Sequence, residues 1–515
     1  MKFSTSCLVS VASIPVLVAA HAQNDFAARH AQHLNPRQAS SVTSSTSLPG
    51  TSTSTPTTSA ATTPVVPPTV TSTPGVPPTT TNIPVISPTP TTPAPVPVPT
   101  TTYTFSLQST NPTAVPLTAI ISSAPSSVTR PLDHTFTPGS VPTFLPGAPP
   151  LPNAAILAPA SYPTLDRVPP IDSPEVQQWI KDVANSGVTI PNIPINNLGG
   201  CPNNTAAATD PDRCWWTCGG CTRPTDVVEC PTAMSWGLTY DDGPSFYTSD
   251  LLNYLDQENL KSTFFVVGSR VISFPNILQT QYMGEHQIAV HTWSHPQLTT
   301  LTNEEIIAEL GWSKKVIKDV LGVTPNMMRP PFGDIDDRVR AISTAMGLTP
   351  VMWTRISAAA TFDTDDFDIH SGLTTVEHVL QNWENILGNV TNRPSGFIVL
   401  EHDLFQQAVE VATGYILPDA LAHQPPFTIQ PVITCLNKPL IDAYIETNDN
   451  KTNPPAASGG PVTLSSGAPG SVQATSGADN SSSNSAASSS LSAGLGLAFL
   501  TSVIGIAAGL AVIRL

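Results

Sequence analysis

The chain has 515 residues, of which 55 are proline and only 11% are charged, and its formal net charge is −16. This length allows two or three domains, but long Ser/Thr/Pro tracts take up much of it, and such tracts cannot bury a core. An acidic chain without basic clusters is poorly suited to nucleic acids or anionic polymers. A neutral or cationic partner suits it better.

The N-terminus has the pattern of a secretory signal. Lys2 precedes an apolar run, and 20-AHA-22 places small residues at a cleavage position. We therefore assign residues 1–22 to a signal peptide. Residues 23–154 follow as a low-complexity segment rich in Ser, Thr and Pro, which predicts an extended, O-glycosylated stalk with no core of its own.

Strand-like and helix-like stretches alternate between residues 155 and 445, which we take as the folded domain. Strands are predicted at 234–240, 262–268, 287–292, 325–331, 349–354, 396–402 and 427–434, and helices at 173–183, 247–258, 274–283, 303–321, 334–347, 375–390 and 405–423. Apolar strands separated by helices predict an α/β fold with a parallel sheet. Seven or eight such units favour a distorted (β/α) barrel over an open sheet.

The C-terminal region is expected to anchor the protein. A Ser-rich linker at 446–490 leads to an apolar tail at 491–515, which is long enough to span a bilayer as a transmembrane helix. Small residues, a polar spacer and a terminal apolar tail are, however, typical of a GPI-attachment signal. We favour the GPI anchor, with Asn480 as the attachment residue.

The cysteines and sequons agree with secretion. Apart from Cys7 in the signal peptide, the cysteines are Cys201, Cys214, Cys218, Cys221, Cys230 and Cys435. An even number in a secreted chain predicts disulfides, whose pairing stays open. The spacing of Cys214, Cys218 and Cys221 also allows a zinc site, which an oxidising compartment disfavours. N-glycosylation is predicted at Asn203, Asn389 and Asn450.

Titratable residues follow the predicted strand ends, where the active site of such a barrel would open. They are Asp241, Asp242, His291, His295, Arg329 and His402. Two histidines four residues apart share one side of a helical turn, which suits two imidazole ligands. Adjacent aspartates at a strand end point in different directions, so one can complete a metal site while the other acts as a base. Core histidines and a helix-capping Asp-Asp turn are the structural alternative.

Four motifs in order, 238-LTYDDGPS-245, 291-HTWSH-295, 329-RPPFG-333 and 400-LEH-402, resemble those of the NodB-type polysaccharide deacetylases, carbohydrate esterase family 4. The resemblance covers about 232–435. It implies the distorted barrel of that family and a divalent transition metal, zinc or cobalt. It also implies that Asp241 is the general base and that the metal ligands are Asp242, His291 and His295.

The resemblance implies further roles around this centre. Arg329 would orient Asp241, and His402 would be the general acid. The backbone N–H of Phe332 would face the oxyanion, and Leu400 would line the acetyl pocket, although core packing also explains a leucine there. Among the tryptophans we take Trp293, which lies inside the second motif, as the residue that stacks on a sugar ring.

A further family motif lies between the third and the last of these, and there two aspartates three apart precede a tryptophan; this chain departs from that pattern. Here 363-DTDDF-367 offers Asp363 and Asp366, with Phe367 in place of the tryptophan and Asp365 and Asp368 as further acids. An aspartate in this motif would hydrogen-bond His402 and raise its pKa. We take Asp363 for that role.

The catalytic motifs imply removal of acetyl groups from a carbohydrate, and the signal peptide, stalk and anchor narrow the choice. Together they are most similar to fungal chitin deacetylases, which hydrolyse the N-acetyl groups of N-acetylglucosamine in chitin to give chitosan and acetate. Chitin, other cell-wall polysaccharides and the plasma membrane are then the expected partners. The alternatives are an esterase that removes O-acetyl groups from a xylan-type polymer and an inactive wall-binding protein.

Overall fold

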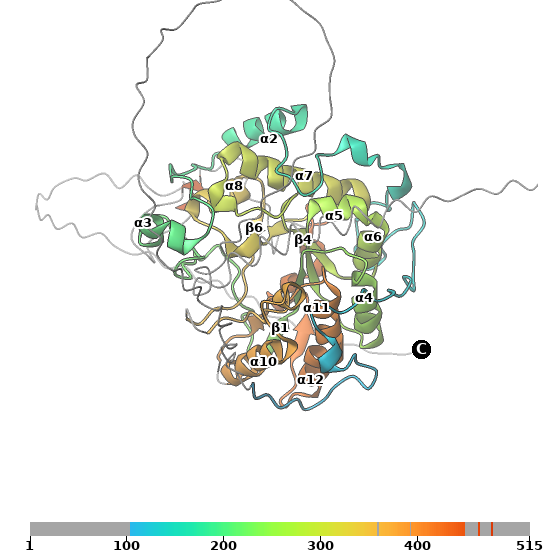
Figure 1. Ribbon diagram of the computed structural model, residues 1–515. Coiled ribbons are helices and arrows are strands. Elements are labelled where there is room, and N and C mark those ends of the chain that lie inside the picture. The colour runs from blue at the N-terminus through green and yellow to red at the C-terminus, as the bar shows by residue number, and fades with distance from the viewer. Residues whose placement is uncertain (1–102, 358–359, 392, 449–461, 464–474, 477–515) are drawn as a thin grey trace, which may run out of the picture.

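The computed structural model describes residues 103–357, 360–391, 393–448, 462–463 and 475–476 (Figure 1). The predicted signal peptide, the anchor tail and the sites Asn450 and Asn480 lie outside the described residues. Within them, no helix is both long enough and apolar enough to cross a membrane.

Parallel strands form the centre of the fold. The order β2-β3-β4-β5-β6 makes one sheet and β7-β1-β8 a second, and every pair in both is parallel. The bounds are β1 Ser235–Gly237, β2 Thr239–Asp241, β3 Thr263–Val266, β4 Gln287–Val290, β5 Met327–Met328, β6 Thr349–Pro350, β7 Phe397–Ile398 and β8 Thr428–Gln430. Residues of β2, β3 and β4 are all buried, as expected for parallel strands covered on both faces.

The two sheets join into a distorted barrel. Only Leu238 separates β1 from β2, so one stretch of chain contributes to both sheets. Parallel bridges connect Asp241 with His402 and Asp363 with Leu400. The N–H of Thr354 also donates to the carbonyl of Ile398 at 3.0 Å, which links the end of the larger sheet to β7. The predicted α/β barrel class is therefore confirmed.

Helices surround the strands, and Figure 1 shows α2 lying over α7 and α8 at one side of the barrel. Their bounds are α2 Pro174–Ala184, α3 Thr205–Ala208, α4 Thr248–Gln257, α5 Gly268–Ser273, α6 Pro275–Met283, α7 Asn303–Leu321, α8 Asp337–Ala345, α9 Asp368–Ser371, α10 Val376–Val390, α11 Gln406–Val411, the π-helical turn η7 Ala412–Ile416, α12 Leu417–Ala422 and α13 Val432–Cys435. The longest, α7, begins with a capping box between Thr302 and Glu305 and ends at the left-handed Gly322.

The last predicted strand is partly wrong. Only 428–430 pair as β8, and 432–435 form the helix α13 instead. Pro431 lies between them and has no N–H to continue the ladder, so the strand ends there.

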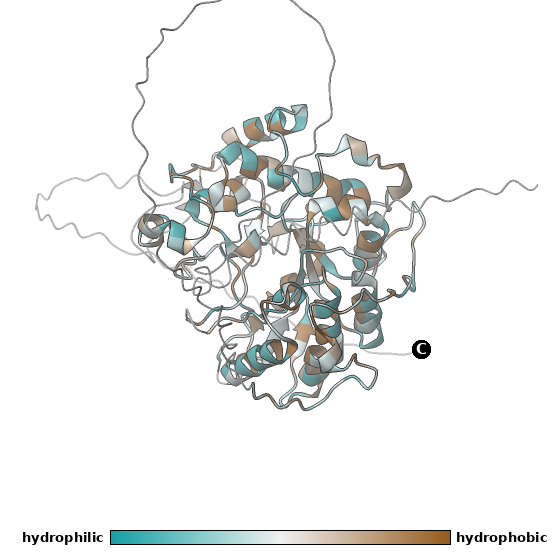
Figure 2. Cartoon of the chain, in the orientation of Figure 1, coloured by the Kyte–Doolittle hydropathy of each residue, from teal (hydrophilic) through white to brown (hydrophobic). Residues whose placement is uncertain are grey.

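The predicted boundary at residue 154 is also wrong, because residues 103–154, here called the strap, pack on the barrel. The strap runs outside α12, α4 and α6 as the blue-to-cyan trace of Figure 1. Ile120 and Leu145 are each 1% exposed and belong to the main core. Apolar residues spaced among the prolines give this segment a buried side that its overall composition conceals. Figure 2 shows apolar positions, in brown, along the strands inside the barrel.

All six predicted cysteines are paired, which confirms the disulfides. The bonds are Cys201–Cys218, Cys214–Cys221 and Cys230–Cys435. The first two close a segment of the chain before β1, and the third joins the region before β1 to α13. The zinc alternative for the Cys214 cluster is excluded, because its sulfurs are in disulfides.

Candidate active site

The two adjacent aspartates turn their carboxylates in different directions. Asp241 ends β2, and the next residue, Asp242, has a φ of 76°. This left-handed conformation, uncommon outside glycine, separates two side chains that would otherwise repel each other. Oδ1 of Asp241 accepts from Nη1 of Arg329 at 2.7 Å. The Asp242 carboxylate instead faces two imidazoles.

Asp242, His291 and His295 form a buried cluster suited to a metal ion. Oδ1 of Asp242 lies 3.2 Å from Nε2 of His291 and 3.1 Å from Nε2 of His295, and their candidate ligand atoms lie within 4.8 Å of one another. Neither Asp242 oxygen has a well-aligned hydrogen-bond donor among the described residues. Nδ1 of His291 contacts the Arg329 carbonyl at 2.8 Å. Its Nδ1–H therefore donates there, which leaves Nε2 as a lone-pair donor for a divalent cation.

The segment between the two histidines is a loop, so the predicted helical turn is wrong. Thr292 and His295 both have positive φ values, of 65° and 58°. The buried carboxylate of Glu309, on α7, holds this loop. Its Oε2 accepts from the N–H of Trp293 at 2.7 Å and of Ser294 at 2.8 Å, and its Oε1 accepts from the Ser294 hydroxyl. Burial raises the pKa of Glu309 to about 7, although these hydrogen bonds oppose the shift.

Arg329 contacts Asp241, the residue that the resemblance implied it would orient. It is fully buried, and Nη1 donates to Thr239 Oγ1 at 2.9 Å as well as to Asp241. Its guanidinium also stacks 4.2 Å from the ring centroid of Phe265. Burial lowers the pKa of Arg329, while the charge of Asp241 raises it. These contacts fix the orientation of the Asp241 carboxylate.

The partner of His402 is Asp366, so the choice of Asp363 is wrong. Nδ1 of His402 lies 2.7 Å from Oδ1 of Asp366, and the His402 N–H donates to its Oδ2 at 2.8 Å. Asp363 bridges Leu400 in parallel register and accepts instead from the N–H of Asp365 at 3.0 Å. That register brings Asp366, three residues later, to His402.

Two opposing effects act on the His402 imidazole. Burial would lower the pKa of His402, but the charge and hydrogen bond of Asp366, together with the charges of Asp242 and Asp241, raise it to about 10. The ring of Phe367 packs edge-on at 5.1 Å between centroids. It occupies the position at which the family motif has tryptophan.

Of the three residues predicted to contact substrate, Phe332 and Leu400 lie at the barrel mouth and Trp293 does not reach the surface. Phe332 lies in the turn after Arg329 with φ 60°, and its ring is 4.5 Å from that of His295 between centroids. Leu400 is buried at the same barrel mouth. Trp293 is 0% exposed, stacks on Tyr162 and donates Nε1–H to the Thr164 carbonyl. The prediction that Trp293 stacks on a sugar is therefore wrong, because neither face of its ring reaches the surface.

Sequence reasoning missed Glu309 and undervalued Asp366. Glu309 sits in the helix pattern 303–321 at a position that packs inward, and a charged residue on an apolar helix face was an available signal. The choice between Asp363 and Asp366 depended on strand register, which the motif alone does not specify.

The sequence has known relatives. The family model named polysaccharide deacetylase matches residues 229–351. Chitin deacetylase 1 of Cryptococcus neoformans var. grubii is 52% identical over 340 residues, which cover 65% of this chain and 71% of that protein. Chitin deacetylase of Amylomyces rouxii is 40% identical over 258 residues, covering 44% and 58%. The structure of the chitin deacetylase from Colletotrichum lindemuthianum is 23% identical, covers 43% of this chain and 95% of that chain, and has a TM-score of 0.38.

The relative from Cryptococcus aligns over more than two thirds of its own length at an identity well above chance. The family match includes β2, β4 and β5 and, at or just after their ends, Asp241, Asp242, His291, His295 and Arg329. This chain belongs to the polysaccharide deacetylase family.

Proposed function

We propose that the protein is a chitin deacetylase, which hydrolyses the N-acetyl groups of N-acetylglucosamine residues to a free amine and acetate. The observation that carries the proposal is one buried constellation at a single barrel mouth. The Asp242–His291–His295 cluster lies there beside the Asp241–Arg329 pair and the His402–Asp366 pair. Asp241 and His402 are partners in a parallel bridge. Two chitin deacetylases among its relatives support the choice of polymer.

The donor set fits a divalent transition metal. Two imidazoles and one carboxylate suit zinc, and cobalt accepts the same ligands. When bound, such an ion polarises the acetamide carbonyl and lowers the pKa of the attacking water. The three ligands would hold it on the Asp242 side of the pair, which leaves Asp241 beside it.

The protein groups divide the proton transfers. Asp241, held by Arg329, accepts the proton of the attacking water. His402 in its imidazolium form gives a proton to the sugar nitrogen as the C–N bond breaks, so the amine leaves and acetate remains. The backbone N–H of Phe332 stabilises the oxyanion of the tetrahedral intermediate, and Leu400 contacts the acetyl methyl group.

Acetate release from chitin oligomers by the mature chain tests the proposal. We expect release that stops when the protein is treated with a chelator and returns with added zinc or cobalt. No acetate from chitin but release from acetylated xylan would identify the esterase alternative. Binding to chitin without acetate from either polymer would identify an inactive wall-binding protein.

Asp366→Asn is expected to move the alkaline limb of the pH profile of kcat/KM to lower pH. Without the Asp366 charge, burial lowers the pKa of His402 with less opposition, so the imidazolium is lost at lower pH. Asp363→Asn is the matched control and should shift the limb less, because Asp363 does not bond the imidazole. An equal or larger shift in Asp363→Asn would restore Asp363 as the supporting residue.

The disulfides, the C-terminal tail and the exposed sequons bear on where the protein is located. Three disulfides are typical of an extracellular protein. We further propose GPI anchoring at the plasma membrane or wall, supported by the tail composition. Asn203 and Asn389 are exposed, which agrees with their proposed glycosylation.

A further inference from the structure

We propose that the two-disulfide segment, residues 201–221, positions the turn that carries the Phe332 N–H, with Trp215 as its main positioning residue. This inference rests on the proposed function, since the turn affects the reaction only if that N–H stabilises the oxyanion. The segment contributes nothing to the metal cluster or to the acid and base. Several of its contacts are with Gly333 and with residues 334–337, which directly follow the third motif.

The turn has a conformation that needs outside support. Phe332 has φ 60° and ψ 12°, and Gly333 follows with φ 63°. Two successive left-handed residues are unusual, and the conformation is unfavourable for a residue with a Cβ such as phenylalanine. Such a backbone persists only where its surroundings fix it.

Asp334 is the first point at which the turn is held. Its Oδ1 accepts from Nε1 of Trp215 at 2.7 Å, and the Thr217 hydroxyl lies 3.1 Å from the same oxygen. Its Oδ2 accepts from both the N–H and the hydroxyl of Thr299, at 2.9 and 2.8 Å. The carboxylate is therefore clamped between the two-disulfide segment and the loop that follows the metal-binding histidines.

Two backbone hydrogen bonds also join the two-disulfide segment to the residues after the turn. The N–H of Trp216 donates to the Ile335 carbonyl, and the N–H of Asp337 donates to the Arg213 carbonyl, both at 3.0 Å. The ring of Trp216 covers Gly333 so closely that a Cβ there would lie 2.3 Å from ring atom Cζ3. A tryptophan ring packed on the second residue of the turn leaves the backbone of Phe332 little freedom.

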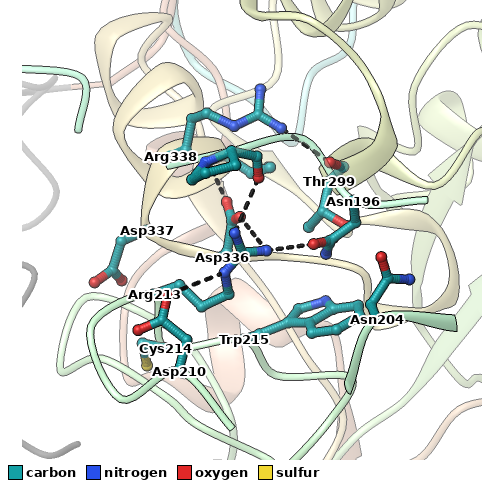
Figure 3. Close-up of polar contacts among 12 residues, drawn as sticks. Asn196, Asn204, Asp210, Arg213, Cys214, Trp215, Thr299, Asp336, Asp337 and Arg338 are labelled. Atoms are coloured by element: carbon teal, nitrogen blue, oxygen red, sulfur yellow. Dashed lines mark hydrogen bonds and ion pairs between the residues drawn. The ribbon is translucent and has the colours of Figure 1, made fainter. Parts of the chain in front are cut away.

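The segment is itself cross-linked. Cys214 and Cys218, on either side of the Trp215–Thr217 stretch, are both in disulfides, which lowers the conformational entropy of this stretch in the unfolded chain. Figure 3 shows Arg213 pointing toward Asn196 and Asp336, with the Trp215 indole beside this group. Arg213 also donates to the Pro194 carbonyl at 2.9 Å.

The proposal predicts where a loss should appear in the kinetics. An oxyanion donor acts in the transition state, so displacing it lowers kcat and kcat/KM together and leaves KM nearly unchanged. A general loss of folding would instead reduce the amount of active protein and its melting temperature.

The decisive variant is Trp215→Phe, which removes one N–H donor and keeps most of the ring. We expect kcat on chitin oligomers to fall roughly tenfold with KM within about twofold. Trp236→Phe is the matched control, since Trp236 is also buried and its Nε1 has no hydrogen-bond partner among the described residues. Its kcat should stay at the wild-type value. An unchanged kcat in Trp215→Phe, or a loss confined to KM, overturns the proposal.

A milder variant, Thr217→Val, and a second measurement, amide hydrogen exchange, test the same positioning role. Thr217→Val removes one hydroxyl from Asp334 without opening the core, and should lower kcat less than Trp215→Phe. Amide hydrogen exchange of residues 332–336 should be faster in Trp215→Phe than in Trp236→Phe. If the wild-type chain released no acetate, the proposed function would fail, and equal exchange in both variants would then independently refute the positioning role.

Discussion

Asp241→Asn is expected to lower kcat on chitin oligomers by roughly 10²- to 10⁴-fold, the range that a positioned general base supplies. The substitution keeps the shape of the side chain and removes its ability to accept a proton from water. Bound metal should be retained, because Asp242, His291 and His295 are the three cluster residues. Acetate release under saturating oligomer and the zinc content per chain measure the two effects separately.

The control for this variant is Asp419→Asn on α12. Asp419 is also fully buried and accepts hydrogen bonds from the Gln108 N–H and the Trp383 Nε1–H, away from the barrel mouth. It should lower the melting temperature and leave kcat unchanged. Loss of zinc from Asp241→Asn would show that Asp241 is a ligand, and near-normal activity would show that another group accepts the proton.

Much of the barrel and its mouth could be predicted because the signals are local. Apolar strands alternate with helical patterns, and a parallel arrangement brings every strand end to the same side. Asp241, His291 and His402 were therefore expected to meet, and the structure brings Asp242, His291 and His295 within ligand distance of one another. The motif order in the sequence added the chemical roles, which remain proposals for these residues.

The errors arise where the deciding contact is distant in sequence. Asp363 and Asp366 are equally plausible from composition, and only the pairing of 363 with 400 selects Asp366. Trp293 lies inside a catalytic motif, yet its ring packs on Tyr162, a residue from before the barrel. The helical turn expected at 291–295 is replaced by a loop because Glu309 binds its backbone N–H groups. Such tertiary contacts are not encoded in local periodicity.

The strap is the longest segment whose packing the sequence did not predict. Removing it is expected to unfold the domain or leave it marginally stable. Ile120, Leu145 and Leu151 are at most 2% exposed. Burying each contributes about 1.5–3 kcal/mol, together roughly 5–9 kcal/mol, against a total stability of about 5–15 kcal/mol for a typical domain. Thermal unfolding of a chain that starts at residue 155, compared with one that starts at 103, measures the effect.

The hydrogen bonds of the strap make the loss cooperative, since they reach separate parts of the barrel. The Asn111 N–H donates to the Gly414 carbonyl, the Tyr415 hydroxyl to the Val115 carbonyl, and Gln279 to the Pro152 carbonyl. Without the strap, these barrel groups would meet water beside newly exposed apolar surface. Deletion of 23–102 is the matched control and should leave the melting temperature unchanged. Equal melting temperatures for chains starting at 103 and at 155 would show that the strap is dispensable and that the folded unit begins at 155, as the composition first suggested.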